Sequence, residues 1–139
     1  MNLITDRTMQ DVLLENAKGQ YGPEDLNRVE SAVALLAENK SILGADFHLE
    51  TKTDWDRTSV YAPDKWPTQA QMERYLGNVR RLCQTLGMQA PLPESMDRLT
   101  WQGANQIEQA LLQVHTWIGA ISYALRFSGE VFAGEENYL

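Results

Sequence analysis

The chain has 139 residues, a net formal charge of −7 and a mean hydropathy of −0.41. Hydrophobic residues make up 43% of it and charged residues 22%, a balance typical of a folded globular protein and unlike that of intrinsically disordered chains. At this length we expect a single domain over residues 1–139. Nucleic-acid binding requires a basic face, and anionic membranes repel an acidic surface. We therefore expect neither nucleic acid nor membrane as a partner.

The single cysteine, Cys83, excludes an internal disulfide and a metal site built from several cysteines. It falls on an apolar helical stripe, so we expect it to be buried as a small hydrophobic residue. The first residues lack the pattern of a signal peptide, and no apolar run approaches the roughly 20 residues of a transmembrane helix.

Two helices are predicted in the first 44 residues. The first is short, begins after a capping Thr8 and ends at Lys18–Gly19. It is too short to stand alone, so its apolar face is expected to pack on the rest of the protein; that face consists of Met9, Val12 and Leu13. The second has Pro23 in its first turn and runs to about Lys40, with an apolar stripe at Leu26, Val29, Val33 and Leu36.

Residues 45–67 break the helical period. The alternation over residues 48–53 indicates a short strand, so this region is predicted to be either a small β-hairpin or an irregular aromatic loop. It carries Trp55, Tyr61 and Trp66, whose rings would be costly to leave in water. We expect them to pack across the helices.

Two further long helices are predicted in the second half. The first is capped by Thr68, with Gln71 closing a capping box, and ends at Gly87. The second is capped by Thr100 and carries one formal charge, Glu108, over residues 101–125. A helix with so few charges is either central to its domain or covered by another subunit. Its stripe has three–four spacing at Ala104, Ile107, Leu111, Val114, Ile118, Ile121 and Leu125.

The last residues, 126–139, contain an aromatic residue followed by Gly-Glu twice, which predicts an extended C-terminal arm with turns. We expect this arm to dock on the helices or on a neighbouring subunit. The predicted fold is therefore mostly α: an antiparallel bundle of three long amphipathic helices with a short N-terminal helix, the loop at 45–67 and the arm. The residues expected at an interface are Trp101, Trp117, Tyr123, Phe127, Phe132 and Tyr138.

Candidates for catalysis or metal binding are few. The two histidines, His48 and His115, lie far apart in the sequence. The His-Leu-Glu triplet at residue 48 is half of a zinc-deaminase signature, but the paired cysteines are absent. Asp54 and Asp56 flank Trp55, as acids do in some sugar sites, whereas the competing interpretation is a turn in which they bond their own backbone. We expect no catalytic residues, no metal and no cofactor.

Four ordered stretches carry a resemblance to a known group of proteins. They are residues 3–8 (LITDRT), residues 25–30 (DLNRVE), residues 52–55 (KTDW) with Pro67-Thr68, and residues 99–108 (LTWQGANQIE) with the Ser-Gly-Glu and Ala-Gly-Glu tail. In that order they resemble a group of bacteriophage and prophage proteins encoded among tail, baseplate and fibre genes or appended to larger structural proteins. The resemblance covers nearly the whole chain.

The resemblance implies a virion structural or host-adsorption module without catalytic activity, made in the bacterial cytoplasm and located in the virion. Its implied partners are other phage tail and baseplate proteins, together with further copies of itself in a homo-oligomer, bound through residues 101–139. An alternative is a small module that binds a glycan or another ligand through the loop at 54–66. The residues of that alternative site are Asp54, Trp55, Asp56, Tyr61 and Trp66.

Overall fold

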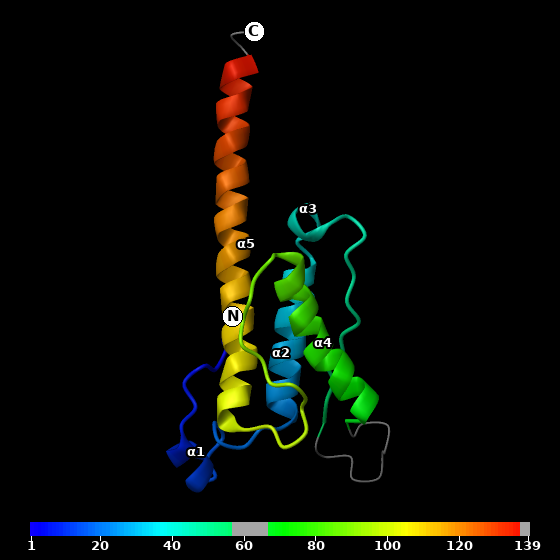
Figure 1. Cartoon of the computed structure of the whole chain (residues 1–139), viewed down its shortest axis with the longest axis vertical. Coiled ribbons are helices and arrows are strands. Elements are labelled where there is room, and N and C mark those ends of the chain that lie inside the picture. The colour runs from blue at the N-terminus through cyan, green and yellow to red at the C-terminus, as the bar shows by residue number, and fades with distance from the viewer. Residues whose placement is uncertain (57–66, 137–139) are drawn as a thin grey trace.

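The computed structural model describes residues 1–56 and 67–136, with residues 127–136 described by their backbone alone. This part of the chain forms five helices, labelled in Figure 1: α1 (Met9–Leu13), α2 (Pro23–Ala37), α3 (Lys40–Leu43), α4 (Gln69–Thr85) and α5 (Trp101–Glu136). No strand occurs in the same ranges. The prediction of a mostly α protein is confirmed.

Three predicted helix starts are confirmed by their side-chain caps. The hydroxyls of Thr8, Thr68 and Thr100 accept hydrogen bonds from backbone N–H groups three residues ahead, at 3.2, 3.1 and 3.0 Å. Each bond satisfies a donor that has no partner within its helix. The first helix, however, ends at Leu13 and not at Lys18–Gly19, because Glu15 takes a left-handed backbone (φ 52°) that a right-handed helix excludes.

The predicted second helix is divided into α2 and α3. Asn39 leaves the helical region of backbone space (φ −77°, ψ 63°), and its side-chain amide donates to the carbonyl of Leu36 at 3.0 Å. That bond satisfies one of the carbonyls that the end of α2 leaves without a helical partner. The chain then makes the single turn of α3 before Gly44.

The prediction of antiparallel helices is wrong. The helices α2, α4 and α5 pack on one another and all begin at the same end of the protein (Figure 1). Accordingly, Met96 and Leu99, just before α5, lie near Gln69 at the start of α4, whereas Met88, just after α4, lies near Trp117 on α5.

The parallel arrangement is possible because the connections are long. A 17-residue helix such as α4 is about 25 Å long. An extended chain covers about 3.3 Å per residue, so residues 86–100 span that length and return to the starting end. Only short connections would force neighbouring helices to run antiparallel.

One core cluster joins α2, α4, the first half of α5 and the extended segment after α3. We call this part of the protein the helical body. In the extended segment, Phe47 and Leu49 are buried while His48 and Glu50 are exposed, as the alternation predicts. Residues 45–56 nevertheless form no strand. Instead, α4 holds their backbone, with Arg81 donating to the His48 carbonyl at 3.2 Å and Asn78 to the Glu50 carbonyl at 2.7 Å.

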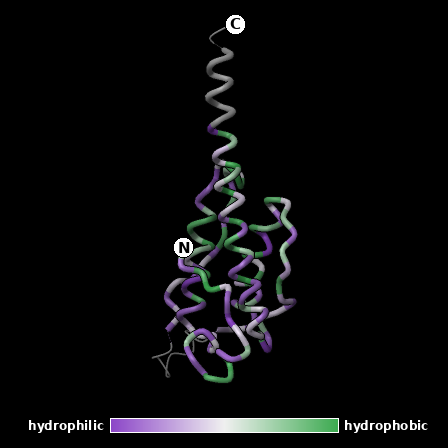
Figure 2. Tube along the Cα trace, turned by 90° about the vertical axis from the view of Figure 1, so that its left-hand side faces the viewer, coloured by the Kyte–Doolittle hydropathy of each residue, from purple (hydrophilic) through white to green (hydrophobic). Residues whose placement is uncertain are grey.

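The helix α5 is much longer than its neighbours. It has 36 residues, against 15 in α2 and 17 in α4, which corresponds to roughly 54 Å at 1.5 Å per residue. Figure 1 shows α5 rising beyond α3 and the rest of the helical body. In Figure 2 the coloured part of α5 already extends past the other helices. Among the described helices none is long and apolar enough to cross a membrane.

The predicted extended arm is therefore wrong for residues 126–136, whose backbone continues α5. No proline interrupts the sequence from Trp101 to Glu136. A glycine inside a helix costs only about 1 kcal/mol relative to alanine, so the repeated Gly-Glu pairs do not end it. Residues 137–139, with Tyr138, and residues 57–66, with Tyr61 and Trp66, lie outside the described part of the chain.

Candidate assembly interface

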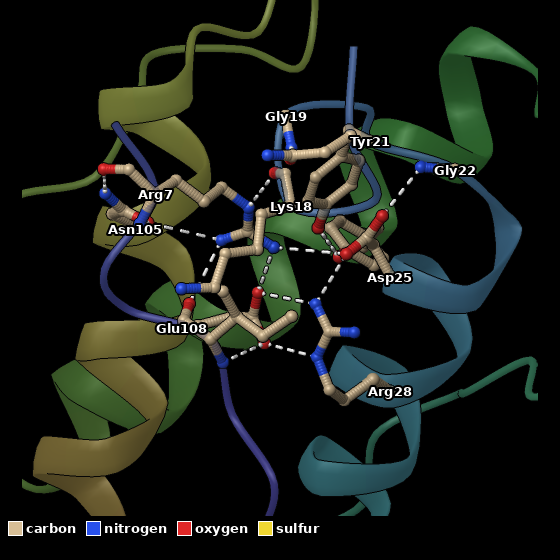
Figure 3. Close-up of polar contacts among 12 residues, drawn as sticks. Arg7, Lys18, Gly19, Tyr21, Gly22, Asp25, Arg28, Asn105 and Glu108 are labelled. Carbon is tan, nitrogen blue, oxygen red and sulfur yellow. Dashed lines mark hydrogen bonds and ion pairs between the residues drawn. The ribbon is translucent and has the colours of Figure 1, made fainter. Parts of the chain in front are cut away.

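The one formal charge between Trp101 and Leu125 anchors α5 to the helical body. Glu108 is fully buried, and its carboxylate accepts hydrogen bonds from three residues of two segments, the N-terminal segment and α2 (Figure 3). Its Oε2 accepts from Nη2 of Arg7 at 2.6 Å and from Nη2 of Arg28 at 2.8 Å. Its Oε1 accepts from Nε of Arg28 at 2.6 Å and from the backbone N–H of Ile4 at 3.0 Å.

Arg7 and Asp25 complete this network. The Arg7 guanidinium donates to Oδ1 of Asp25 at 3.1 Å, and Arg28 donates to the same oxygen at 2.6 Å. The Arg7 backbone exchanges two hydrogen bonds with the side-chain amide of Asn105, at 3.0 and 2.9 Å. Hydrogen bonding to Glu108 raises the pKa of Arg28 above its ordinary value. The two arginines balance the charge of the two carboxylates, so no buried charge is left unpaired. The hydrogen bonds of this network join the N-terminal segment, α2 and α5 near the base of α5.

A second buried carboxylate, Glu30, positions Trp55. Its two oxygens accept from Arg74 of α4 at 2.7 and 2.8 Å, and Oε2 also accepts from the Trp55 indole N–H at 2.9 Å. The Trp55 backbone is held by the side-chain amide of Asn27, at 2.8 and 2.9 Å. Trp55 is only 4% exposed, so it packs across the helices as predicted. It does not present an open ring on which a sugar can stack.

The two aspartates beside Trp55 lie in different surroundings. Asp54 is exposed and forms an ion pair with Lys52 at 2.8 Å. Asp56 lines a cleft of about 840 Å³ at the end of the helical body where α2 and α4 begin. In the described part of the predicted ligand loop, Asp56 and the largely buried Trp55 both line the cleft, whereas Asp54 is exposed to solvent.

This cleft falls within the size range of small-molecule sites, about 300–1,000 Å³. Its walls are mainly apolar and include two acids. Among the lining residues are Tyr21, Leu26, Met72, Leu99, Asp56 and Asp97. The sequence did not predict it, because residues that are far apart in the chain form its wall.

The candidate catalytic residues do not converge in the described part of the chain. His48 and His115 are both exposed and lie on separate elements, the extended segment and α5. No group of three or more histidine, cysteine or acidic residues there is placed to hold a metal ion. Cys83 is buried as predicted, and burial raises the pKa of its thiol. Arg80 and Arg81, neighbours in the sequence, each donate a hydrogen bond to a backbone carbonyl of the protein, those of Pro93 and His48.

Beyond the helical body, the apolar stripe of α5 becomes exposed. The stripe is fully buried from Ile107 to Val114 and nearly so at Ile118. Ile121 is then half-buried, and Leu125 is 56% exposed. We call Ile121 and Leu125 the projecting seam.

The predicted interface residues are distributed along α5. Trp101 is half-buried at the start of the helix, whereas Trp117 and Tyr123 are 50% and 73% exposed. Phe127 and Phe132 lie on the helical backbone that continues to Glu136. Large apolar side chains exposed in succession are typical of a protein-binding surface.

The short helix α1 also exposes apolar side chains. We expected its face to pack on the protein, but none of its residues is buried. Met9, Leu13 and the following Leu14 are each more than half exposed, and Val12 is 40% exposed. Hydrogen bonds of Arg7 hold the segment before α1 against the helical body. This fixes the position of α1 although none of its side chains is buried. This patch lies at the opposite end of the protein from the tip of α5 (Figure 1).

No family model, no curated protein and no solved structure matches this chain.

Proposed function

We propose that this chain is a non-catalytic structural module of a phage tail, baseplate or fibre, and that it assembles through the second half of α5. The sequence resemblance supports the virion setting. The exposed end of α5 supports the assembly role and is the observation that carries the proposal.

Leaving the apolar side chains at this end of α5 in water costs free energy. Fully burying a leucine or isoleucine side chain contributes about 1.5–3 kcal/mol. Helices also draw most of their stability from packing of their apolar face. The projecting seam, together with Trp117, has the apolar surface that a partner would cover. A base anchored at Glu108 holds the helix in a defined direction for that partner.

The virion setting is tested in the phage that encodes the chain. We expect the protein to be detected by mass spectrometry in purified particles, and deletion of its coding sequence to reduce plaque formation. Complementation with the wild-type chain should restore plaques, whereas the Ile121→Glu/Leu125→Glu variant should not. Particles that lack the protein but remain fully infectious would contradict the proposal.

A second candidate function, binding of a glycan or another small ligand, is supported by the cleft beside Asp56. Its test is a glycan array probed with the wild-type protein and with Met72→Trp, a substitution that narrows the cleft. Binding that is lost in the variant would support this function. Trp55→Ala is a poor test, because it removes a buried core residue.

A further inference from the structure

The connection that follows α4 lies against α5 and forms a groove with it. This connection runs back along α5 toward the end of the protein where α4 begins (Figure 1). The groove has a volume of about 490 Å³, which is within the range of small-molecule sites. We call it the tryptophan groove, because Trp117 forms part of its wall. Its polar lining residues are Gln89 of the connection and Gln109, Gln113 and Thr116 of α5.

Trp117 offers this groove an open aromatic ring. It is 50% exposed, whereas Trp55 beside the other cleft is 4% exposed. An indole combines a large apolar ring with a single N–H donor. A ligand that covers the ring of Trp117 must therefore have an apolar face and, at the edge of that face, a hydrogen-bond acceptor.

The polar groups beside Trp117 are uncharged. The three glutamines and Thr116 are exposed. In the described part of the chain, no protein group is hydrogen-bonded to their side chains or to the Trp117 indole N–H. Amides and hydroxyls both donate and accept hydrogen bonds. The groove therefore offers a ligand several donors and acceptors that the described residues do not occupy.

We propose that the tryptophan groove binds a neutral carbohydrate, with one sugar ring stacked on Trp117 and its hydroxyls bonded to the glutamines and Thr116. The C–H groups on one side of a pyranose ring form an apolar face, and the hydroxyls at its edge both donate and accept. An aromatic surface with a few polar groups is the composition expected of such a site. The site is separate from the cleft beside Asp56, and the inference goes beyond the proposed assembly function.

The same lining argues against other classes of ligand. An apolar helix would cover the amides and the hydroxyl without offering them hydrogen bonds, and a buried polar group without a partner is destabilising. A phosphorylated, sulfated or sialylated ligand requires lysine or arginine, and a cationic ligand requires a carboxylate. None of these residues occurs among the described residues that line the groove. The cleft beside Asp56 differs, because its wall includes two acids.

The tryptophan groove and the projecting seam lie on different sides of α5. At 3.6 residues per turn, Thr116 points about 140–180° away from Ile121 and Leu125, whereas Trp117 lies about 40–80° from them. A sugar bound at Thr116 therefore leaves the seam open to an assembly partner. Because Trp117 borders both surfaces, the tests also use Gln113 and Thr116.

The first test is an array of neutral, sialylated and sulfated glycans, probed with the whole chain. We expect binding to neutral glycans. Trp117→Ala, which removes the ring, and Gln113→Ala/Thr116→Ala, which removes two hydrogen-bonding groups, should each weaken this binding by at least about tenfold. The control Tyr123→Ala removes a ring that is 73% exposed but lies outside the groove, and it should bind as the wild type does. Circular dichroism should show a folded helical body in every variant.

Three array results would overturn the inference: no binding to any neutral glycan, selective binding of the charged glycans, or unchanged binding after Trp117→Ala. The variant Met72→Trp separates the two candidate sites. It narrows the cleft beside Asp56 and should leave binding in the tryptophan groove unchanged. Binding that is lost in Met72→Trp but kept in Gln113→Ala/Thr116→Ala would place the glycan in the cleft and overturn the inference.

The second test separates carbohydrate binding from assembly by the mass in solution, measured by light scattering. Gln113→Ala/Thr116→Ala leaves Ile121 and Leu125 intact, so its mass should equal that of the wild type. A changed mass would mean that the groove is covered by an assembly partner and would overturn its assignment to a carbohydrate.

Discussion

Replacing Glu108 by glutamine tests whether the buried network holds α5 to the helical body. The substitution keeps the shape of the side chain but removes its negative charge. It also replaces a carboxylate oxygen, which accepts from Arg7 and Arg28, by an amide N–H group that cannot accept. Arg28 is 20% exposed and can turn its charge toward water, whereas Arg7, at 2%, cannot. Breaking a buried ion pair by removing one partner costs about 3–5 kcal/mol. Because Asp25 and Asn105 still bind Arg7, we expect about 3 kcal/mol.

The assays are urea unfolding and thermal unfolding, both followed by circular dichroism at one protein concentration, because association of the folded protein changes the measured stability. A loss of about 3 kcal/mol in the free energy of unfolding lowers the midpoint of thermal unfolding by roughly 10 °C in a chain of this size. The control is Asp6→Asn, which breaks the exposed Lys18–Asp6 pair and should leave the midpoint nearly unchanged. A loss below about 1 kcal/mol for Glu108→Gln would refute the reasoning, since the network would then not be desolvated as described.

Three further predictions concern the core, the alkaline limit and α4. Leu111→Ala should cost about 2–5 kcal/mol in urea unfolding, and the neighbouring Leu112→Ala, at an exposed site, less than 1 kcal/mol; equal losses would contradict the assigned face. Burial raises the pKa values of Tyr21 and Tyr75 above 10, so both hydroxyls stay protonated in the folded protein. The free energy of unfolding should therefore fall as the pH rises above 10. The absorbance of tyrosinate should rise together with unfolding, and this rise should be smaller in Tyr75→Phe. Gly77→Ala should stabilise the protein by about 0.5–1 kcal/mol, because an added Cβ meets no atom within 4 Å; a lower urea midpoint would contradict this.

Local signals in the sequence predicted local structure well. A threonine cap is decided within four residues, so Thr8, Thr68 and Thr100 could be recognised without knowledge of the fold. Burial of the stripe from Ile107 to Ile118 also follows from spacing alone.

Long-range features were missed for a physical reason. Glu108 was recognised as an isolated charge, but its partner Arg7 is 101 residues away and carries no signal of its own in the sequence. The parallel direction of α2, α4 and α5 depends on the path of long connections, which periodicity does not report. The extended arm was predicted from Gly-Glu pairs, although glycine weakens a helix without ending it.

The location of the buried charges and the direction of the projecting seam are connected. Because α5 extends well beyond the helical body, a force that a partner applies at Leu125 is transmitted along the helix to its base. At that base Glu108 is bound by α2 and by the N-terminal segment at once. Apolar contacts alone permit small rotations of a helix about its axis, whereas directed hydrogen bonds from two sides do not. The network therefore fixes the face on which Ile121 and Leu125 are presented. On this reasoning Glu108→Gln should weaken assembly through the projecting seam as well as stability, although Glu108 lies outside that seam.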